Sequence, residues 1–404
     1  MTYKNSARNR FNVLPRIILP LVAINIVSCG GKDSKESEPA SAELSLIQTL
    51  DLPLEPTAIS TGDLNMDGID DIVVAYDTAG ANDHTGLQVF FGNLNGRYSL
   101  HTTIEYGFPI FDASIVDFNN DGIKDIVFTD GRQLHLARAD SNFQYQEPTI
   151  INKWVSGAIL FDLALMNDDQ ILDLVSWYGQ DLHVSFGTPE GHFETGVLIS
   201  PDVRSYFTSD FNGDGNLDIL FKRSLPFSTE IVFGNPDGSF TNQTTIDDSN
   251  PGTNHLVPGD INGDGWDDVF TVAGNGGGRM NILMSLKNGE FEETLLLTHE
   301  NEFGIDMFYT DKAIPLDINC DNLDDLLVLE FPTNELKSLI SDGSGAFSSG
   351  PQILADNTST TNILFAKTHA DLLGSAKFLR GLMSDVGPEA YTLEIYGNPA
   401  CTDF

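Results

Sequence analysis

Hydrophobic and polar residues alternate along most of the chain in short runs, with the period of a β-strand rather than of a helix. One kind of strand recurs, followed by a Gly-containing turn and then by an aromatic residue that begins the next strand. Copies of this strand begin near residues 89, 134, 184, 231, 282, 339 and 393. The aromatic residues that follow the first six copies are Tyr98, Phe143, Phe193, Phe240, Phe291 and Phe347. The pattern predicts an all-β chain made of seven similar units.

An acidic motif alternates with these strands. Its first copy runs from Asp63 to Asp71 and precedes the apolar run at 72–74. Further intact copies begin at Asp117, Asp210, Asp260 and Asp317. A degenerate copy has Leu165 and Gln170 where Asp and Gly are expected, and a seventh, at about Asp371 to Leu379, is placed by spacing alone. Successive copies lie 45 to 57 residues apart, which is the size of a four-stranded propeller blade.

The alternation of acidic loop and Phe-Gly strand resembles the FG-GAP/VCBS repeat family, whose best-known relative is the propeller head of integrin alpha chains. The resemblance covers residues 44–404 and implies a seven-bladed β-propeller. It also implies that the acidic loop joins the first and second strands of a blade, and that Phe-Gly ends the third. The sequence stops soon after the third strand of blade seven. We therefore expect residues 43–50 to supply the missing strand and close the ring.

The acidic loops have the composition of calcium sites. In each nine-residue loop, positions 1, 3, 5 and 9 offer side-chain oxygens and position 7 offers a backbone carbonyl. Position 6 is Gly, which allows a positive φ, except in the loop from Asp317, where Asn322 is tolerated because Asn enters the left-handed region more readily than other residues. Oxygen-only ligands favour calcium over transition metals. The predicted side-chain ligands are Asp63, Asn65, Asp67, Asp71, Asp117, Asn119, Asp121, Asp125, Asp210, Asn212, Asp214, Asp218, Asp260, Asn262, Asp264, Asp268, Asp317, Asn319, Asp321 and Asp325. The predicted carbonyl ligands belong to Ile69, Ile123, Asn216, Trp266 and Leu323.

Two alternatives bear on these loops. Helix-loop-helix calcium sites carry a Glu at position 12, where these loops have Val, Phe or Thr. Asp and Asn are also common in tight turns that hold no ion. Five near-identical copies favour calcium over simple turns, whereas for the loop at Leu165 to Asp173 we favour a turn because the first ligand is missing.

The net charge of the chain limits the kinds of partner it can bind. It has 59 acidic and 21 basic residues, a net charge of −38, so a role in binding nucleic acid is excluded. The same excess of acid disfavours peripheral attachment to anionic lipid, so membrane association should come from an anchor.

Such an anchor is predicted at the N-terminus. Residues 1–16 contain four bases and no acid, and residues 17–27 form an apolar core that is too short to span a bilayer. The sequence around Cys29 then resembles the lipobox of bacterial lipoproteins. This resemblance implies a signal peptide over 1–28, a lipidated Cys29, a polar tether over 29–43 and, from Gly30, sorting to the outer membrane. The alternative is an ordinary cleaved signal peptide, and the side of the membrane is left open.

Cys320 and Cys401 are the two remaining cysteines. They are expected in loops on the same face of the propeller, in a compartment that permits disulfides, so we consider a Cys320–Cys401 bond. The alternative is two free thiols.

The sequence offers no catalytic signature, so we predict no catalytic residues. It does offer a candidate ligand face, because loops opposite the acidic ones carry aromatic and basic residues suited to a glycan, an anionic polymer or a protein. The candidates on this face are Arg132, Trp154, Trp177, Tyr178, Arg223 and Arg279. The alternative is that these bases offset nearby acids and that the aromatics pack between blades.

Together these features predict a calcium-binding lipoprotein of the cell envelope that acts as a recognition or adhesion module for an extracellular glycan or protein ligand. Two other functions stay open. A polysaccharide-active lyase or hydrolase would show acids or His in the central channel and would release product. A structural subunit of an envelope complex would co-purify with a partner and would not bind glycans.

Overall fold

The structure is a computed structural model in which the strands form seven four-stranded antiparallel sheets. It describes residues 45–77, 85–152, 158–224, 227–246, 255–272, 279–298, 312–330, 335–354, 364–367, 377–383 and 391–397. In these ranges the regular elements are all strands, and no helix has the length and hydropathy of a membrane span. The all-β, seven-bladed fold expected from the repeats is confirmed.

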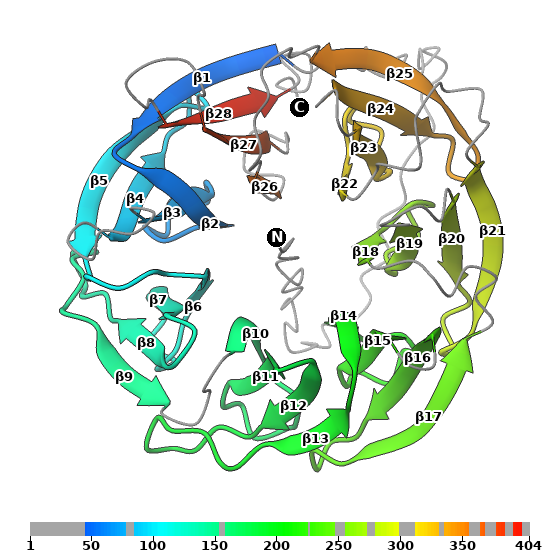
Figure 1. Ribbon diagram of the computed structural model, residues 1–404, viewed down its shortest axis with the longest axis horizontal. Helices are drawn as coiled ribbons and strands as arrows, with labels where there is room; N and C mark the ends of the chain where they lie inside the picture. The colour runs from blue at the N-terminus through cyan, green and yellow to red at the C-terminus, as the bar shows by residue number, and fades with distance from the viewer. Residues whose placement is uncertain are drawn as a thin grey trace, which may run out of the picture.

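The sheets stand around a ring, with the first strand of each blade toward the centre (Figure 1). Blade one contains β2 (Glu55–Gly62), β3 (Asp71–Asp77), β4 (Gly86–Gly92) and β5 (Tyr98–Glu105). Blade two contains β6 (Asp112–Val116), β7 (Asp125–Thr129), β8 (Leu134–Ala137) and β9 (Thr149–Asn152). Blade three contains β10 (Ala158–Ala164), β11 (Asp173–Tyr178), β12 (Asp181–Ser185) and β13 (Val197–Ser200). Blade four contains β14 (Val203–Ser209), β15 (Asp218–Ser224), β16 (Phe227–Gly234) and β17 (Phe240–Ile246).

The next two blades repeat the same order. Blade five contains β18 (His255–Gly259), β19 (Asp268–Val272), β20 (Arg279–Ser285) and β21 (Phe291–Thr298). Blade six contains β22 (Lys312–Leu316), β23 (Asp325–Glu330), β24 (Glu335–Ser341) and β25 (Phe347–Leu354). In each of these blades consecutive strands are neighbours, as expected for a meander.

Blade seven is completed by the start of the described chain. Its strands are β26 (Leu364–Lys367), β27 (Lys377–Met383) and β28 (Tyr391–Gly397), and β1 (Ser45–Leu52) pairs antiparallel with β28. The closing strand predicted at 43–50 is therefore confirmed, displaced by two residues. The seventh acidic motif, predicted near Asp371, begins outside the described residues, and its last residues fall in β27.

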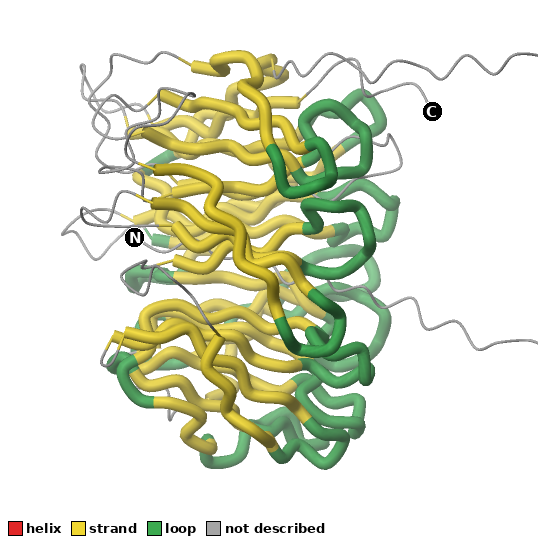
Figure 2. The backbone as a smooth tube through the Cα atoms, turned by 90° about the vertical axis from the view of Figure 1, so that its right-hand side faces the viewer, coloured by secondary structure: helices red, strands yellow, loops and turns green. Residues whose placement is uncertain are grey.

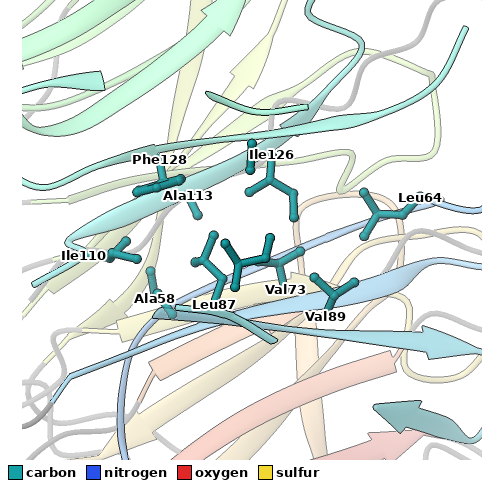
Figure 3. Packing of buried hydrophobic residues seen from close by; sticks show 12 residues of the cluster. Ala58, Leu64, Val73, Leu87, Val89, Ile110, Ala113, Ile126 and Phe128 are labelled. Carbon is teal, nitrogen blue, oxygen red and sulfur yellow. The ribbon is translucent and has the colours of Figure 1, made fainter. Parts of the chain in front are cut away.

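The core lies between neighbouring blades. Second strands carry unbroken apolar runs, such as Ile72, Val73 and Val74 in β3, because a blade covers each of their two faces. Between blades one and two, Val73 and Val89 pack against Ala113 and Phe128 (Figure 3). Similar clusters fill the interfaces that follow, so each blade is stabilised by its neighbours rather than by a core of its own.

The two faces of the disc carry different connections. The loops between first and second strands, together with the turns between third and fourth strands, gather on one face, at the right of Figure 2. The turns between second and third strands and the links between blades lie on the opposite face. Functional groups on these two classes of loop are therefore separated by the length of a blade.

Candidate calcium loops and ligand face

Each intact acidic loop joins the first and second strands of its blade, as predicted, and the loop of blade one links β2 to β3. Side chains at positions 1, 3 and 5 hold the loop's own backbone. The N–H of position 6 donates to Oδ2 of position 1 at 2.8–3.0 Å in all five intact loops. The N–H groups of positions 5 and 7 donate to Oδ1 of positions 3 and 5. The loops share one conformation although their other residues differ.

Two left-handed residues curl each intact loop. Position 6 has positive φ as predicted, and Asn322 adopts it at 69°. Position 4 also has positive φ, which the sequence analysis missed. The position-4 residues are Met66, Asn120, Gly213, Gly263 and Cys320. The sequence gave a signal at this position only in Gly213, Gly263 and Asn120, since Asn also enters the left-handed region.

Position 9 ties the loop to the end of the third strand. In blade one, Asp71 is fully buried, accepts the N–H of Leu64 at 2.9 Å through Oδ2, and accepts the N–H of Gly92 at 2.8 Å through Oδ1. Burial raises the pKa of this carboxyl to about 7, although the two amides act in the opposite direction. Asp218, Asp268 and Asp325 form the same pair of bonds and have similarly raised pKa values.

The degenerate loop of blade three keeps this tie. Asp173 accepts the N–H groups of Met166 and Gly187, both at 2.8 Å, and burial raises its pKa to about 6. Gln170 adopts positive φ at position 6. Position 9 therefore has a structural role that does not depend on a complete set of ligands.

The residue types fit calcium, which prefers several oxygen donors. In blade one Asp63 accepts, among the described residues, the N–H groups of Asp67 and Gly68, so its carboxylate keeps further lone pairs. The neighbouring carboxylates raise the pKa of Asp71 further, and a cation would relieve this repulsion. The described residues do not, however, bring three or more His, Cys, Asp or Glu side chains together as a ready metal cluster. The loops therefore carry the oxygen donors that calcium prefers without a preassembled cluster of carboxylates in the described residues.

Consecutive loops contact one another around the ring. Trp266, whose backbone carbonyl is a predicted calcium ligand, packs its ring against Gly213 of the preceding loop. Leu323 lies against Gly263 in the same way. Asp324, at position 8, accepts the N–H of Asp260 at 2.9 Å. Position 8, which the sequence analysis did not single out, thus connects blades five and six.

The acidic loop of blade five has a basic side chain beside it. Lys287 Nζ lies 3.2 Å from Oδ2 of Asp264, at position 5 of the blade-five loop. Lys287 comes from the turn between β20 and β21 on the same face. Loops with the same predicted ligands therefore differ in their electrostatic surroundings.

The candidates on the opposite face do not share one environment. Arg132 is exposed on the turn between β7 and β8. Arg223 lies 3.7 Å from Glu230, and the half-buried Trp177 donates its Nε1–H to the carbonyl of Val203 at 2.8 Å. Trp177 also packs against the core between blades three and four, which matches the packing alternative. Tyr178 and Arg279 belong to β11 and β20, and Trp154 lies outside the described residues.

The cysteines are described in part. Cys320 is disulfide-bonded, and its partner lies outside the described residues. Cys29 and Cys401 also lie outside them, so the Cys320–Cys401 pairing and the lipidation of Cys29 stay predictions.

Comparison with known proteins supports the repeat and the fold. Residues 63–128, from the first acidic loop through most of β7, match the family model of an FG-GAP-like repeat. A lectin from Agrocybe aegerita, described as recognising non-reducing terminal N-acetylglucosamine, is similar in structure with a TM-score of 0.57 and 18% identity, over 77% of this chain and 82% of the lectin. A Lactobacillus plantarum protein is similar with a TM-score of 0.51 and 11% identity, over 74% of this chain and 85% of that protein. No curated protein matches the sequence. At these identities the structural likeness shows the fold.

Proposed function

We propose that this propeller of the FG-GAP/VCBS family is a calcium-stabilised recognition module of the bacterial cell envelope, which binds a glycan or protein ligand. The observation that supports this proposal is that two kinds of loop lie on opposite faces of the disc. Repeated oxygen-rich loops occupy one face (Figure 2). Exposed aromatic and cationic side chains lie on the described part of the other face. The first face suits ions that stiffen the ring, and the second suits a ligand.

The calcium part of the proposal is structural. Positions 1, 3, 5, 7 and 9 of the five intact loops would hold the ions, which would offset the carboxylates gathered there. Extracellular calcium modules bind with dissociation constants of about 10⁻⁴ to 10⁻³ M. At tenfold excess each site would add roughly 1.4 kcal/mol, and five independent sites about 7 kcal/mol, comparable with the stability of a whole domain.

Removing calcium should therefore destabilise the protein. We expect dialysis against a chelator to lower Tm by about 10 °C or more, and added calcium, but not magnesium, to restore it. Thermal unfolding followed by circular dichroism, with calcium content measured by atomic absorption, tests this. An unchanged Tm in protein shown to be free of calcium would contradict the proposal.

The recognition part of the proposal rests on the propeller fold and on the exposed aromatic and cationic side chains of the face opposite the acidic loops. A lectin of similar fold supports the idea that such a ring carries saccharide sites, although 18% identity carries over no individual residue. The test is a glycan array probed in calcium and again in chelator. Binding to a defined glycan supports the proposal, whereas silence across the array together with no protein captured from envelope extracts contradicts it.

The envelope location rests on the lipobox-like sequence at Cys29. We expect metabolic labelling with a radioactive fatty acid to mark the full chain, and a Cys29→Ala variant to lose both the label and the membrane fraction. If the Cys29→Ala variant were labelled as strongly as the wild type, Cys29 would not be the lipid anchor. The proposed recognition face would be unaffected by that result.

A further inference from the structure

The link between blades one and two exposes two aromatic rings on the face opposite the acidic loops. Phe108 and Phe111 lie three residues apart in the segment between β5 and β6, and the two residues are 55% and 42% exposed. Gly107 precedes them with φ of +93°, and a Cβ there would meet nothing within 4 Å. Water and solutes therefore reach both rings.

The rings are held in place by the surrounding fold. Ile110, between them, is fully buried in the core of blades one and two (Figure 3). The Phe111 ring lies on Gly131, where an added Cβ would come within 2.9 Å of it, and the Phe111 N–H donates to the Thr129 carbonyl at 2.9 Å. Phe108 contacts the ring of Tyr106, with centroids 5.8 Å apart. A ligand would find the surface already formed, with little ordering cost.

Polar groups border the rings. The Tyr106 hydroxyl lies 2.6 Å from His135 Nε2 and 3.2 Å from Asp130 Oδ2. Asp130 Oδ1 accepts the N–H groups of Arg132 and Gln133 at 2.8 and 2.7 Å, which fixes the turn. Arg132 is exposed on this turn, so its guanidinium can donate hydrogen bonds to a bound molecule. We call Tyr106, Phe108, Phe111, Asp130 and Arg132 the aromatic platform.

This combination favours a sugar over other ligands. The C–H face of a pyranose ring packs on aromatic rings, while its hydroxyls need both donors and acceptors at the edge. Two exposed rings match one or two sugar units and fall far short of the roughly 800 Å² per partner buried in a stable protein interface. Phe227, the other large exposed ring on the described part of this face, lies in blade four with Arg204 5.2 Å above it.

The local charge selects among sugars. Among the described residues here, the carboxylates are that of the exposed Glu105 and that of Asp130, whose side chain is 10% exposed, and the guanidinium is that of Arg132. A uronate or sulfated sugar would meet net repulsion here, whereas an uncharged sugar can donate a hydroxyl to the exposed Glu105 carboxylate and accept from the guanidinium. The acidic loops lie a blade's length away, roughly 20 Å for a six-residue strand. That exceeds the Debye length of about 8 Å at physiological salt, so the local groups dominate.

We propose that the aromatic platform is a subsite for an uncharged pyranose ring, which stacks on Phe108 and Phe111 and hydrogen-bonds to Arg132. Asp130 is a positioning residue, which fixes the turn that carries Arg132. This inference rests on the proposed recognition function and gives it a site and a ligand class.

The test uses the full chain in calcium and four variants. The probes are the methyl pyranosides of glucose, galactose and mannose, with sodium glucuronate as the acidic probe, followed by saturation-transfer NMR and a glycan array. We expect binding of at least one neutral probe, weakened about tenfold or more in F108A and in R132A. F108W, which keeps an aromatic face, should bind within about threefold of wild type. F227A removes an exposed ring from the same face outside the platform and should bind like wild type.

The outcomes separate the subsite from the general function. Tm shows whether each variant is folded, and the high exposure of Phe108 makes F108A a mild change to the fold. Neutral-sugar binding that persists in folded F108A overturns the subsite and leaves the recognition function in place. Preference for glucuronate overturns the ligand class. A wild-type chain that is silent toward every glycan overturns the subsite together with the glycan function, leaving protein partners to be tested by capture from envelope extracts.

Discussion

At the scale of single residues, loops with the same predicted ligands differ in their neighbours. Lys287 Nζ lies 3.2 Å from Oδ2 of Asp264, so a calcium ion entering the blade-five loop would compete with an ammonium group. Exposed ion pairs of this kind contribute about 0.2–1 kcal/mol. We predict that Lys287→Gln raises the calcium affinity of this loop about two- to fivefold. Isothermal titration of calcium into chelator-stripped protein measures the change.

The matched control for that prediction is Arg97→Gln. Arg97 is exposed in the turn between β4 and β5, on the same face of the disc. Its removal changes the net charge equally but leaves the Lys287–Asp264 pair intact. Equal gains in affinity in both variants would mean that long-range charge, rather than the ion pair, sets the affinity.

His135, also at the residue scale, should make stability depend on pH. It is buried, and desolvation lowers its pKa although Asp130 acts in the opposite direction. Below its unfolded pKa of about 6.5 the unfolded chain takes up a proton that the folded protein resists, so His135 disfavours the fold as pH falls. We predict that between pH 7 and 5 the wild type loses more unfolding free energy than His135→Asn. Urea unfolding of both proteins at several pH values measures this, and parallel pH profiles would contradict it.

At the scale of the loop, position 9 combines two roles that mutation can separate. Asn at this position keeps one acceptor for the two buried amides and loses the other, which should cost about 1–2 kcal/mol. We predict that Asp173→Asn, in the degenerate loop, and Asp218→Asn, in an intact loop, destabilise the protein equally in chelator. In calcium, Asp218→Asn alone should lose additional stability, because it also removes a predicted ligand. Denaturant unfolding in both buffers measures the difference, and equal losses in calcium would show that Asp218 does not bind the ion.

Most of the fold could be predicted at this scale, because strand period, turn glycines and acidic loops repeat together. Positive φ at position 6 followed from Gly68 and its equivalents. The same conformation at position 4 did not, because Met66 and Cys320 give no local signal, and it accompanies hydrogen bonds from the next N–H to the side chains at positions 1 and 3. The burial of individual aromatic residues could not be predicted either. Nothing in the sequence distinguishes Trp177, which packs between blades, from Phe108, which is exposed on the face opposite the acidic loops. The acidic motif predicts a loop conformation, whereas a ligand site depends on which faces the blades leave open.

At the scale of the whole molecule, the ring depends on one strand from outside the last repeat. β1 pairs with β28 and buries Leu52 in the cluster that joins blades seven and one. The Gln48 side chain adds a second tie, donating to the Tyr98 carbonyl at 2.9 Å and accepting the Tyr98 N–H at 2.8 Å. β1 therefore connects the last blade to the first and covers an edge that would otherwise be open to other chains.

Two truncations test this closure. We expect a chain that begins at Ser45 to match the unfolding free energy of the full chain, because it keeps all of β1. A chain that begins at Pro53 loses the β1–β28 ladder and the burial of Leu52, and should be destabilised by about 5 kcal/mol or more. Its exposed β28 edge should also promote association. Urea unfolding and light scattering measure the two effects, and in the full chain Gln48→Ala should cost about 1–2 kcal/mol without association. If the two truncated chains were equally stable and both monomeric, the seven blades would hold together without the closing strand, and contacts between neighbouring blades would suffice to keep the ring.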